Sequence, residues 1–509
     1  MTGLTRICNP TELRTELTAL FANEWEIPNG TAASIYDNVV LESIKKLKPT
    51  VHFVIEAPYA DSMYRDTYYS YFATKLKDYK KDCIRLSFFD GPLSASDFRE
   101  HAGLSTLQER YYGFMVLRPT IPNVIGRSII HPKALQEDNF LCVTSSYPSS
   151  VHAVKLVAEG FPHSSQDAEM ISCAETSIWA VMEYFSSRYA EYSPVPPSMI
   201  AEIIKSRSHA RLIPTEGLLT EQISFAIREL GFGAKIYTRD ELGDILFRRA
   251  FSSYIESGLP LILGMDNSHR TGTIGHALIA IGRTQTTDEL TDNLLVSEES
   301  DSDLKSIIRD KGILFFDNDD IPRKIVFIDD NMPPYRLQSF DTPALHYNGP
   351  DWKACRINEF IVPLHPKLYL EAITAKAYIK ELLLRGTFPI ANGTEIFVRL
   401  FLASSRSYKD YIARSINFNS DAREYITDMF MSEFIWVAEI SDKVNIKRRQ
   451  AFGLFILDAT EPNPDGYSAL IFGGYKNIFY SWNGRKNRLV KKCLDLGNFS
   501  VYINNLKGF

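Results

Sequence analysis

The chain has 509 residues, of which 45% are hydrophobic and 23% charged, and its formal net charge is −6. This length predicts about three domains, and the composition supplies enough apolar material for their cores without favouring disorder. The small negative charge excludes a broad basic surface, so nucleic acid is not an expected partner. No run approaches the roughly twenty apolar residues of a membrane span, so no membrane partner is expected either.

Cysteine usage and the N-terminal sequence indicate a reducing cytoplasm. The N-terminal residues have no apolar core of the signal-peptide type. The cysteines show no paired spacing, which argues against a disulfide framework and a Cys-x-x-Cys zinc site. No HExxH motif or glycine-rich phosphate loop is present, so we expect no metal and no cofactor. The six cysteines are at positions 8, 83, 142, 173, 355 and 493.

Residues 1–160 are predicted to form an N-terminal α/β module. Asn9-Pro10 is typical of a helix start and precedes ELRTELTALFANEW, and a second helix is predicted over 32–47. Short apolar runs predict strands, and the last of them leads directly into the region that follows. These runs cover residues 51–57, 83–89, 112–119 and 152–158.

The stretch from 163 to 189 combines a reactive residue type with a strong helical pattern. Cys173 opens a run whose apolar residues recur at helical spacing through Tyr189. A cysteine in the first turn of a helix lies where free N–H groups and the helix dipole favour thiolate over thiol. Gln166, seven residues earlier, could supply a side-chain amide that joins the Cys173 backbone N–H as an oxyanion donor.

A histidine and an acid follow at the edges of two short apolar runs. His276 begins the run GHALIAIGR, and Asp329 and Asp330 end the run KIVFIDDN. Both runs are typical of buried strands bounded by turns. A helix with Cys173, then a strand with His276 and another with an acid, gives a nucleophile, a base and an orienting group in chain order.

From Gln166 to Asp330 the chain resembles the papain-like cysteine peptidases, in particular the bacterial branch that includes the leader peptidases of bacteriocin exporters. The resemblance rests on Gln166, the helix headed by Cys173, and the segments 217–237, 257–265, 275–282 and 326–331. It implies an α+β fold in which the helix that bears Cys173 packs on an antiparallel sheet that bears His276 and the acid. It also implies amide hydrolysis through an acyl-enzyme.

Two features of this chain differ from the pattern of that branch. Gln166 is one residue further from the cysteine than usual, and the Cys-Gly-Pro of the branch is Cys173-Ala174-Glu175 here. We expect Glu175 to point to solvent and to favour the helix dipole from the first turn. The branch's sequence of a hydrophobic strand, one polar residue and then the acid selects Asp330 as the orienting acid, with Asp329 as the alternative, because alternation does not decide at a strand end.

The catalytic domain is predicted over 161–350, followed by a C-terminal α+β module over 351–509. Within the catalytic domain, residues 284–322 are acidic and interrupted, which predicts a mobile insertion that could cover the cleft. In the C-terminal module, one long helix is predicted over 365–386, followed by strands of a mostly antiparallel sheet. The predicted strands cover residues 395–403, 433–440, 452–459, 468–474 and 499–504.

The predicted function is a cysteine hydrolase that cleaves a peptide or isopeptide bond. His163 is interpreted as a structural hydrogen-bonding group, and His269 as a weaker candidate base or a substrate contact. Three alternatives stay open: a transglutaminase-like acyl transfer with the same triad, a catalytically silent scaffold that binds a protein partner, and three residues that never meet. The long flanking regions favour restricted specificity toward a protein or peptide, such as a protein encoded beside it in a bacterial operon.

Overall fold

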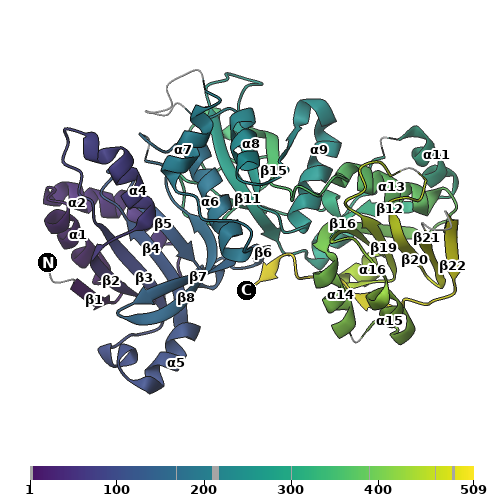
Figure 1. The fold of residues 1–509 in the computed structure, drawn as a ribbon, viewed down its shortest axis with the longest axis horizontal. Helices are drawn as coiled ribbons and strands as arrows, with labels where there is room; N and C mark the ends of the chain where they lie inside the picture. Colours follow the sequence, from purple (N-terminus) through teal and green to yellow (C-terminus); the bar gives the residue numbers. More distant parts are fainter. Residues whose placement is uncertain are drawn as a thin grey trace.

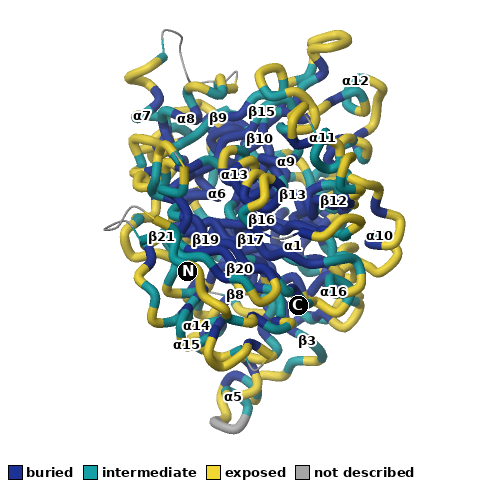
Figure 2. Tube along the Cα trace, turned by 90° about the vertical axis from the view of Figure 1, so that its right-hand side faces the viewer, coloured by how far each residue is buried: buried dark blue, intermediate teal, exposed yellow. Residues whose placement is uncertain are grey.

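The computed structural model describes residues 4–509 except 168, 209–216, 300, 389, 416, 465 and 484–487, and, at 101 and 102, the backbone alone. The fold is mixed α+β and contains three large sheets, the N-terminal, central and C-terminal sheets. Figure 1 shows these sheets following one another along the longest axis of the molecule. In Figure 2 the strands are mostly buried, and the connecting loops are mostly exposed.

The N-terminal sheet has the strand order β1-β2-β3-β4-β5-β8-β7. All its described pairs are antiparallel, so the expected α/β module is instead an α+β arrangement. Strands β7 and β8 are joined by a short turn, as antiparallel pairing allows, whereas helices lie between β1 and β2, between β2 and β3, and between β3 and β4. The strands are β1 (Leu4–Cys8), β2 (Val51–Tyr59), β3 (Cys83–Asp90), β4 (Tyr111–Leu117), β5 (Ile125–Ile130), β7 (Ser145–Val151) and β8 (Val154–His163). The helices are α1 (Leu13–Glu24), α2 (Asn29–Ile35), α3 (Leu41–Ile44), α4 (Ser62–Ser70) and α5 (His101–Arg110).

The central sheet has the order β14-β13-β11-β10-β15-β9, and β6 and β24 extend it beside β11. Strand β15 lies inside this sheet and β24 comes from the end of the chain, so the sheet continues past the boundary expected at residue 350. The strands are β6 (Phe140–Cys142), β9 (Lys235–Thr238), β10 (Leu261–Asp266), β11 (Gly275–Thr284), β13 (Ile325–Ile328), β14 (Arg336–Gln338), β15 (Arg356–Val362) and β24 (Lys507–Gly508). The helices are α6 (Cys173–Arg188), α7 (Pro197–Lys205), α8 (Thr220–Glu229), α9 (Arg239–Glu256) and α12 (Pro350–Lys353).

The C-terminal sheet has the order β12-β16-β17-β19-β20-β21-β22, in which only the pairing of β12 with β16 is parallel among the described strands. Its strands are β12 (Leu314–Asp317), β16 (Glu395–Ser404), β17 (Phe434–Ser441), β19 (Gly453–Asp458), β20 (Leu470–Tyr475), β21 (Ile478–Asn483) and β22 (Arg488–Lys492). The helices are α10 (Asp288–Asp292), α11 (Ser302–Asp310), α13 (Ala372–Leu384), α14 (Ser405–Arg414), α15 (Ser420–Asp428) and α16 (Lys443–Lys447). A small separate pair joins β18 (Gln450–Ala451) to β23 (Phe499–Ser500).

The acidic segment 284–322 is built into the C-terminal sheet. Its strand β12 pairs with β16, and Asp317 at the end of this strand is buried against the Lys376 ammonium group, 2.8 Å away. Residues 314–317 therefore form a paired strand of the C-terminal sheet, whereas the predicted mobility of the rest of the segment stays a prediction. Asp317 and Asp319 pair with the buried ammonium group of Lys376, which offsets part of the cost of burying their charges.

Helix α6 lies between the N-terminal and central sheets. Its residues 174–182 are all buried, and Ile178 and Val181 belong to one apolar core with Phe161 of β8 and Ile279 of β11. A helix with apolar contacts on opposite sides is fixed in position and rotation. The first turn of α6 is thereby held against the start of β11.

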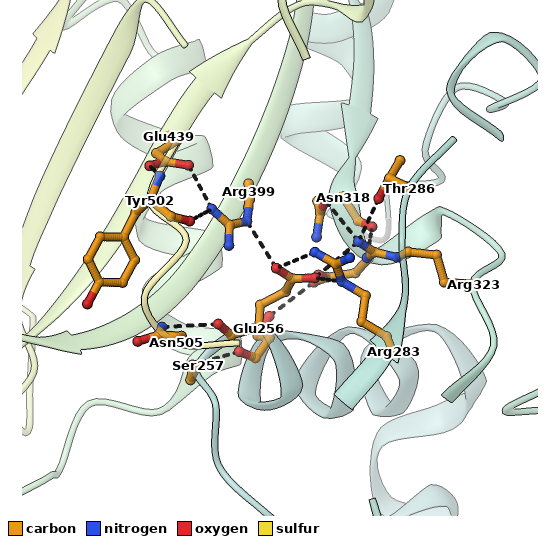
Figure 3. Close-up of polar contacts among 12 residues, drawn as sticks. Glu256, Ser257, Arg283, Thr286, Asn318, Arg323, Arg399, Glu439, Tyr502 and Asn505 are labelled. Atoms are coloured by element: carbon orange, nitrogen blue, oxygen red, sulfur yellow. Dashed lines mark hydrogen bonds and ion pairs between the residues drawn. The ribbon is translucent and has the colours of Figure 1, made fainter. Parts of the chain in front are cut away.

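A buried ionic cluster connects the central and C-terminal sheets (Figure 3). Glu256, at the end of α9, accepts hydrogen bonds from Arg283 of β11, Arg323 and Arg399 of β16. Arg399 also pairs with Glu439 of β17 at 3.0 Å. Burial would raise the pKa of Glu256, but the three guanidinium groups outweigh it and hold this pKa well below its usual range.

Candidate functional site

Cys173 is the first residue of α6, as the sequence predicts. The Ser172 hydroxyl caps the helix by accepting from the Ala174 N–H at 3.3 Å. The Glu175 carboxylate turns back and accepts from the Ser172 N–H at 3.1 Å and from its hydroxyl, which completes a capping box. Glu175 is buried rather than exposed to solvent, so that expectation is wrong, because the carboxylate satisfies donors that the helix start would leave free.

His276 lies at the start of β11, directly beside Cys173. The backbone N–H of Ala277, the next residue, points to the Cys173 sulfur at 3.4 Å. The imidazole Nε2 is 3.0 Å from Asp329 Oδ1, which leaves Nδ1 as the nitrogen available to the sulfur. Burial disfavours the imidazolium, but the charge of Asp329 and hydrogen bonds with Asp329 and Cys173 outweigh it and raise the pKa of His276 well above its usual range.

The acid bonded to the histidine is Asp329, which follows the end of β13, and not Asp330. Asp329 also accepts from the Tyr347 hydroxyl at 2.9 Å and from the backbone N–H of Asn331 at 3.0 Å. Burial would raise its pKa, but the charge and hydrogen bond of His276 hold that pKa far below the usual range. The sequence pattern favoured Asp330; the turn that begins at the end of β13 presents Asp329 to His276 instead.

Asp330 is buried beside this group without a hydrogen-bond partner for either side-chain oxygen among the described residues. Its Oδ1 lies 3.6 Å from His276 Nε2, beyond hydrogen-bonding distance. Burial raises the pKa of Asp330 to about 7, and the negative charge of Asp329 adds to this shift. The Asp330 carboxyl group therefore holds its proton to higher pH than in the unfolded chain.

Asp330→Asn is expected to remove a pH dependence of stability. Because the folded-state pKa of Asp330 is raised, its contribution to stability is fully present below about pH 4 and is lost as the pH rises through about 7. The variant should therefore gain about 2–4 kcal/mol relative to wild type between pH 4.5 and pH 8.5. Urea unfolding at both pH values measures this, with Asp240→Asn at an exposed site as control. Parallel pH profiles for Asp330→Asn and wild type would contradict the assignment.

Aromatic residues from the segment after β14 enclose the histidine and its acid. Tyr347, which bonds both oxygens of Asp329, stacks on Trp352 with ring centroids 4.0 Å apart. Trp352 meets the His276 ring edge to face at 5.7 Å. Neither residue was predicted from the sequence, since Tyr347 lies in a turn and Trp352 in the four-residue helix α12, both too short to show periodicity. A tyrosine and a tryptophan close together after the acid strand were the available signal.

His163 supports the loop that carries the acids. Its Nε2 lies 3.2 Å from the Asp329 carbonyl oxygen and 3.0 Å from that of Met332. Burial lowers the pKa of His163, so the neutral ring donates one N–H to these carbonyls. This confirms the interpretation of His163 as a structural hydrogen-bonding group. His269 lies exposed in the turn after β10.

Gln166 points toward the acid loop. Its side-chain amide donates to the Asn331 side-chain oxygen at 2.9 Å, and Asn331 in turn donates its backbone N–H to Asp329. Among the described contacts, the Gln166 amide is therefore bonded to Asn331, the residue after Asp330. Its predicted role as an oxyanion donor for Cys173 stays a prediction.

A pocket of about 300 Å³ lies beside Cys173 and His276. It is bounded by the start of α6, the segment before α8, and neighbouring parts of three central strands. The described residues that line it are Cys173, Ala174, Gly217, Leu218, Leu219, Thr220, Ile223, Gly264, Met265, Asp266, Gly275, His276, Ala277 and Glu359. The proposed nucleophile therefore faces a space that can hold a ligand group.

His276, Asp329 and Asp330 also form the one group among the described residues whose side chains lie close enough to hold a metal ion, with ligand atoms within 4.8 Å of one another. The observed bond between His276 Nε2 and Asp329 matches an imidazole held by a carboxylate and uses atoms of two of the three groups, whereas the Asp330 oxygens accept no hydrogen bond from the described residues. We therefore interpret His276 and Asp329 as a hydrogen-bonded pair.

Comparisons with known proteins suggest no function for this chain, so a functional proposal has to rest on the geometry of the site. The described chain contains no helix that is both long and apolar enough to cross a membrane. Neither a protein-family model nor a curated protein matches this sequence.

Proposed function

We propose that this protein is a papain-like cysteine hydrolase that cleaves an amide bond through Cys173, His276 and Asp329. The observation that supports it is a chain of contacts in the wall of a pocket. Cys173 lies at a helix start, the His276 side chain and the Ala277 N–H contact its sulfur, and Asp329 bonds the far nitrogen of the imidazole. Asp329 takes the orienting role because it makes the hydrogen bond to Nε2, whereas Asp330 does not.

In the proposed reaction, His276 takes the proton of Cys173 and the thiolate attacks the substrate carbonyl carbon. The tetrahedral oxyanion is stabilised by the backbone N–H of Cys173 at the helix start, and such a donor is worth about 2.7–4 kcal/mol. Collapse breaks the C–N bond, and His276 donates its proton to the leaving amine. His276 then deprotonates a water molecule that attacks the thioester, which releases the carboxylic acid and restores the thiol.

The substrate is proposed to be a protein or peptide cleaved with restricted specificity. The N-terminal and C-terminal sheets with their helices account for much of the chain, and both are joined to the central sheet through shared apolar cores. Large bodies fixed around a site limit which substrates can approach it. A protein encoded in the same bacterial operon would fit this restriction.

The test is a comparison of wild type with Cys173→Ala on a library of peptides from a bacterial proteome in H₂¹⁸O. We expect new peptide termini that carry ¹⁸O with wild type and none with the variant. Cleavage that persists in Cys173→Ala would contradict the proposal. Products joined to an added amine without ¹⁸O would show acyl transfer, and no product from a protein whose Cys173 is reactive would favour the scaffold.

A further inference from the structure

The pocket beside Cys173 carries two carboxylates on the strands that form its wall. Asp266 ends β10, and Glu359 lies in β15, the next strand of the sheet. In register, Ala277 of β11 faces Gly264 of β10, and Gly264 faces Glu359 of β15. Because neighbouring strands are about 4.8 Å apart, the backbone of Glu359 lies about 10 Å from that of Ala277, whose N–H contacts the Cys173 sulfur.

The Glu359 side chain leans from its own strand over β10. A Cβ atom at Gly264 would come within 2.6 Å of both Cγ and Oε1 of Glu359, so this carboxylate occupies the space above the glycine. The strand pairing shifts register between Gly264 and Met265, and such bulges redirect side chains. The glycine and the bulge together let the Glu359 carboxylate lie in the pocket between β15 and Cys173.

Neutral groups hold both carboxylates in place. Glu359 accepts a hydrogen bond from the Thr220 hydroxyl. Asp266 accepts from the Asn358 amide at 2.7 Å and from the Ser268 N–H at 2.8 Å. Burial opposes its charge, yet these hydrogen bonds keep the pKa of Asp266 below its usual range. Both side chains are therefore fixed as acceptors without a described ion pair to a lysine or arginine.

The described lining of the pocket contains no lysine or arginine. His276 is the one basic side chain among those residues, and its charge is compensated by Asp329 at 3.0 Å. Two carboxylates in a cleft with low-dielectric walls concentrate a negative potential there. A ligand group should bind this pocket most tightly if it carries a positive charge on an aliphatic stem that is long enough to fill the pocket.

We propose that this pocket binds the cationic side chain of a lysine or arginine of the substrate, next to the bond that Cys173 attacks. Glu359 and Asp266 are the positioning residues for this side chain, and the apolar walls of the pocket cover its stem. The inference rests on the proposed function, since it names the substrate class of the same site. It restricts the substrates to peptides that carry a basic residue within one side-chain length of the scissile carbonyl.

The first experiment measures the charge preference at Cys173 without a substrate. Three methanethiosulfonates that differ in charge, with trimethylammonioethyl, methyl and sulfonatoethyl groups, react with the full-length protein, and mass spectrometry quantifies the peptide that contains Cys173. Each rate of Cys173 modification is divided by the rate of the same reagent with free cysteine. We expect this ratio to be at least about tenfold higher for the cationic reagent than for the anionic one at low salt. The preference should shrink in 0.5 M NaCl, because salt screens a potential that is open to solvent.

Glu359→Gln and Asp266→Asn should each reduce this preference severalfold, while the rate with the neutral reagent stays within about twofold. Glu221→Gln, an exposed acid beside Thr220 on α8, is the matched control and should leave the preference unchanged. A second pair of probes, the chloromethyl ketones of acetyl-lysine and acetyl-norleucine, tests the side-chain class. We expect the lysine reagent to label Cys173 at least about tenfold faster, and Glu359→Gln to remove most of this difference.

The outcomes separate the two proposals. Labelling of Cys173 with the charge preference of free cysteine would overturn the cationic subsite and leave the cysteine hydrolase intact. No labelling by any of the reagents would contradict an accessible nucleophile and so overturn both. A preference for the cationic reagent in a protein that cleaves no peptide would support the subsite and count against hydrolysis.

Discussion

His276→Ala is expected to slow alkylation of Cys173 by iodoacetamide about 10²-fold at pH 6. In the wild-type protein the buried imidazole has a pKa well above its usual range, so it is protonated at this pH and places a positive charge beside the Cys173 sulfur, which favours attack by sulfur. Alanine removes this charge and leaves only neutral donors near the sulfur among the described groups, the helix start and the Ala277 N–H, so the reactive thiolate is less favoured. The rate is measured between pH 5 and pH 9 on the peptide that contains Cys173, which excludes signal from the other cysteines.

Substitutions of nearby residues test whether the slower alkylation is due to the loss of the His276 imidazole itself. His269→Ala, seven residues earlier in an exposed turn, is the matched control and should react like wild type. Asp329→Asn should slow the reaction at pH 6 about tenfold, since the amide no longer stabilises the imidazolium. Asp330→Asn should change it by less than about threefold, because that side chain makes no hydrogen bond to the ring. Equal rates for His276→Ala and wild type would show that the two residues do not form an activated pair.

Glu256→Gln is expected to destabilise the protein by about 3–5 kcal/mol, the usual effect of removing one partner of a buried ion pair. The glutamine keeps the shape of the side chain but leaves Arg283, Arg323 and Arg399 close together without their shared anion. Their mutual repulsion in a buried site cannot be relieved by water. Thermal unfolding and resistance to proteolysis measure the loss, and cleavage should appear first near the junction of the central and C-terminal sheets.

Glu42→Gln is the control for this substitution. Glu42 pairs with Lys45 at 3.0 Å on an exposed helix face, with 57% of its side chain accessible, and such pairs contribute about 0–1 kcal/mol. The pKa of Glu256 is depressed, so its contribution to stability is present above about pH 4.5 and is lost as the pH falls through its folded-state value. A melting temperature for Glu256→Gln equal to that of Glu42→Gln would show that the cluster is not needed for stability.

Local patterns predicted the elements of the candidate site well. The apolar spacing after Cys173 predicted a helix, and α6 begins at this residue. The runs after His276 and before Asp329 predicted buried strands, and they form β11 and β13. Each of these predictions rests on neighbours a few residues apart, whose spacing decides which side of an element is apolar. The long helix predicted over 365–386 forms only as α13, from Ala372 to Leu384.

Predictions that depended on contacts distant in sequence failed or stayed open. The choice between Asp329 and Asp330 depends on the direction of a turn after β13, and alternation does not fix the side chains there. The error on Glu175 was instead local: its partner, the N–H of Ser172, lies three residues away in a Ser-x-x-Glu capping box that the sequence already contains. The acidic segment was expected to be mobile because Lys376, which neutralises Asp317, lies 59 residues further along the chain.

The sequence by itself determined the helix that begins at Cys173, the two strands beside His276 and Asp329, and the order of these residues along the chain. Only the tertiary structure decided that Asp329 rather than Asp330 bonds the imidazole, and that Glu359 leans over Gly264 into the pocket. The spacing of apolar residues in one element shows which of its sides faces the core and which faces water. The pairing of elements depends instead on strand register and on turns. The geometry of the candidate site is set by this pairing, and so it appears only in the folded chain.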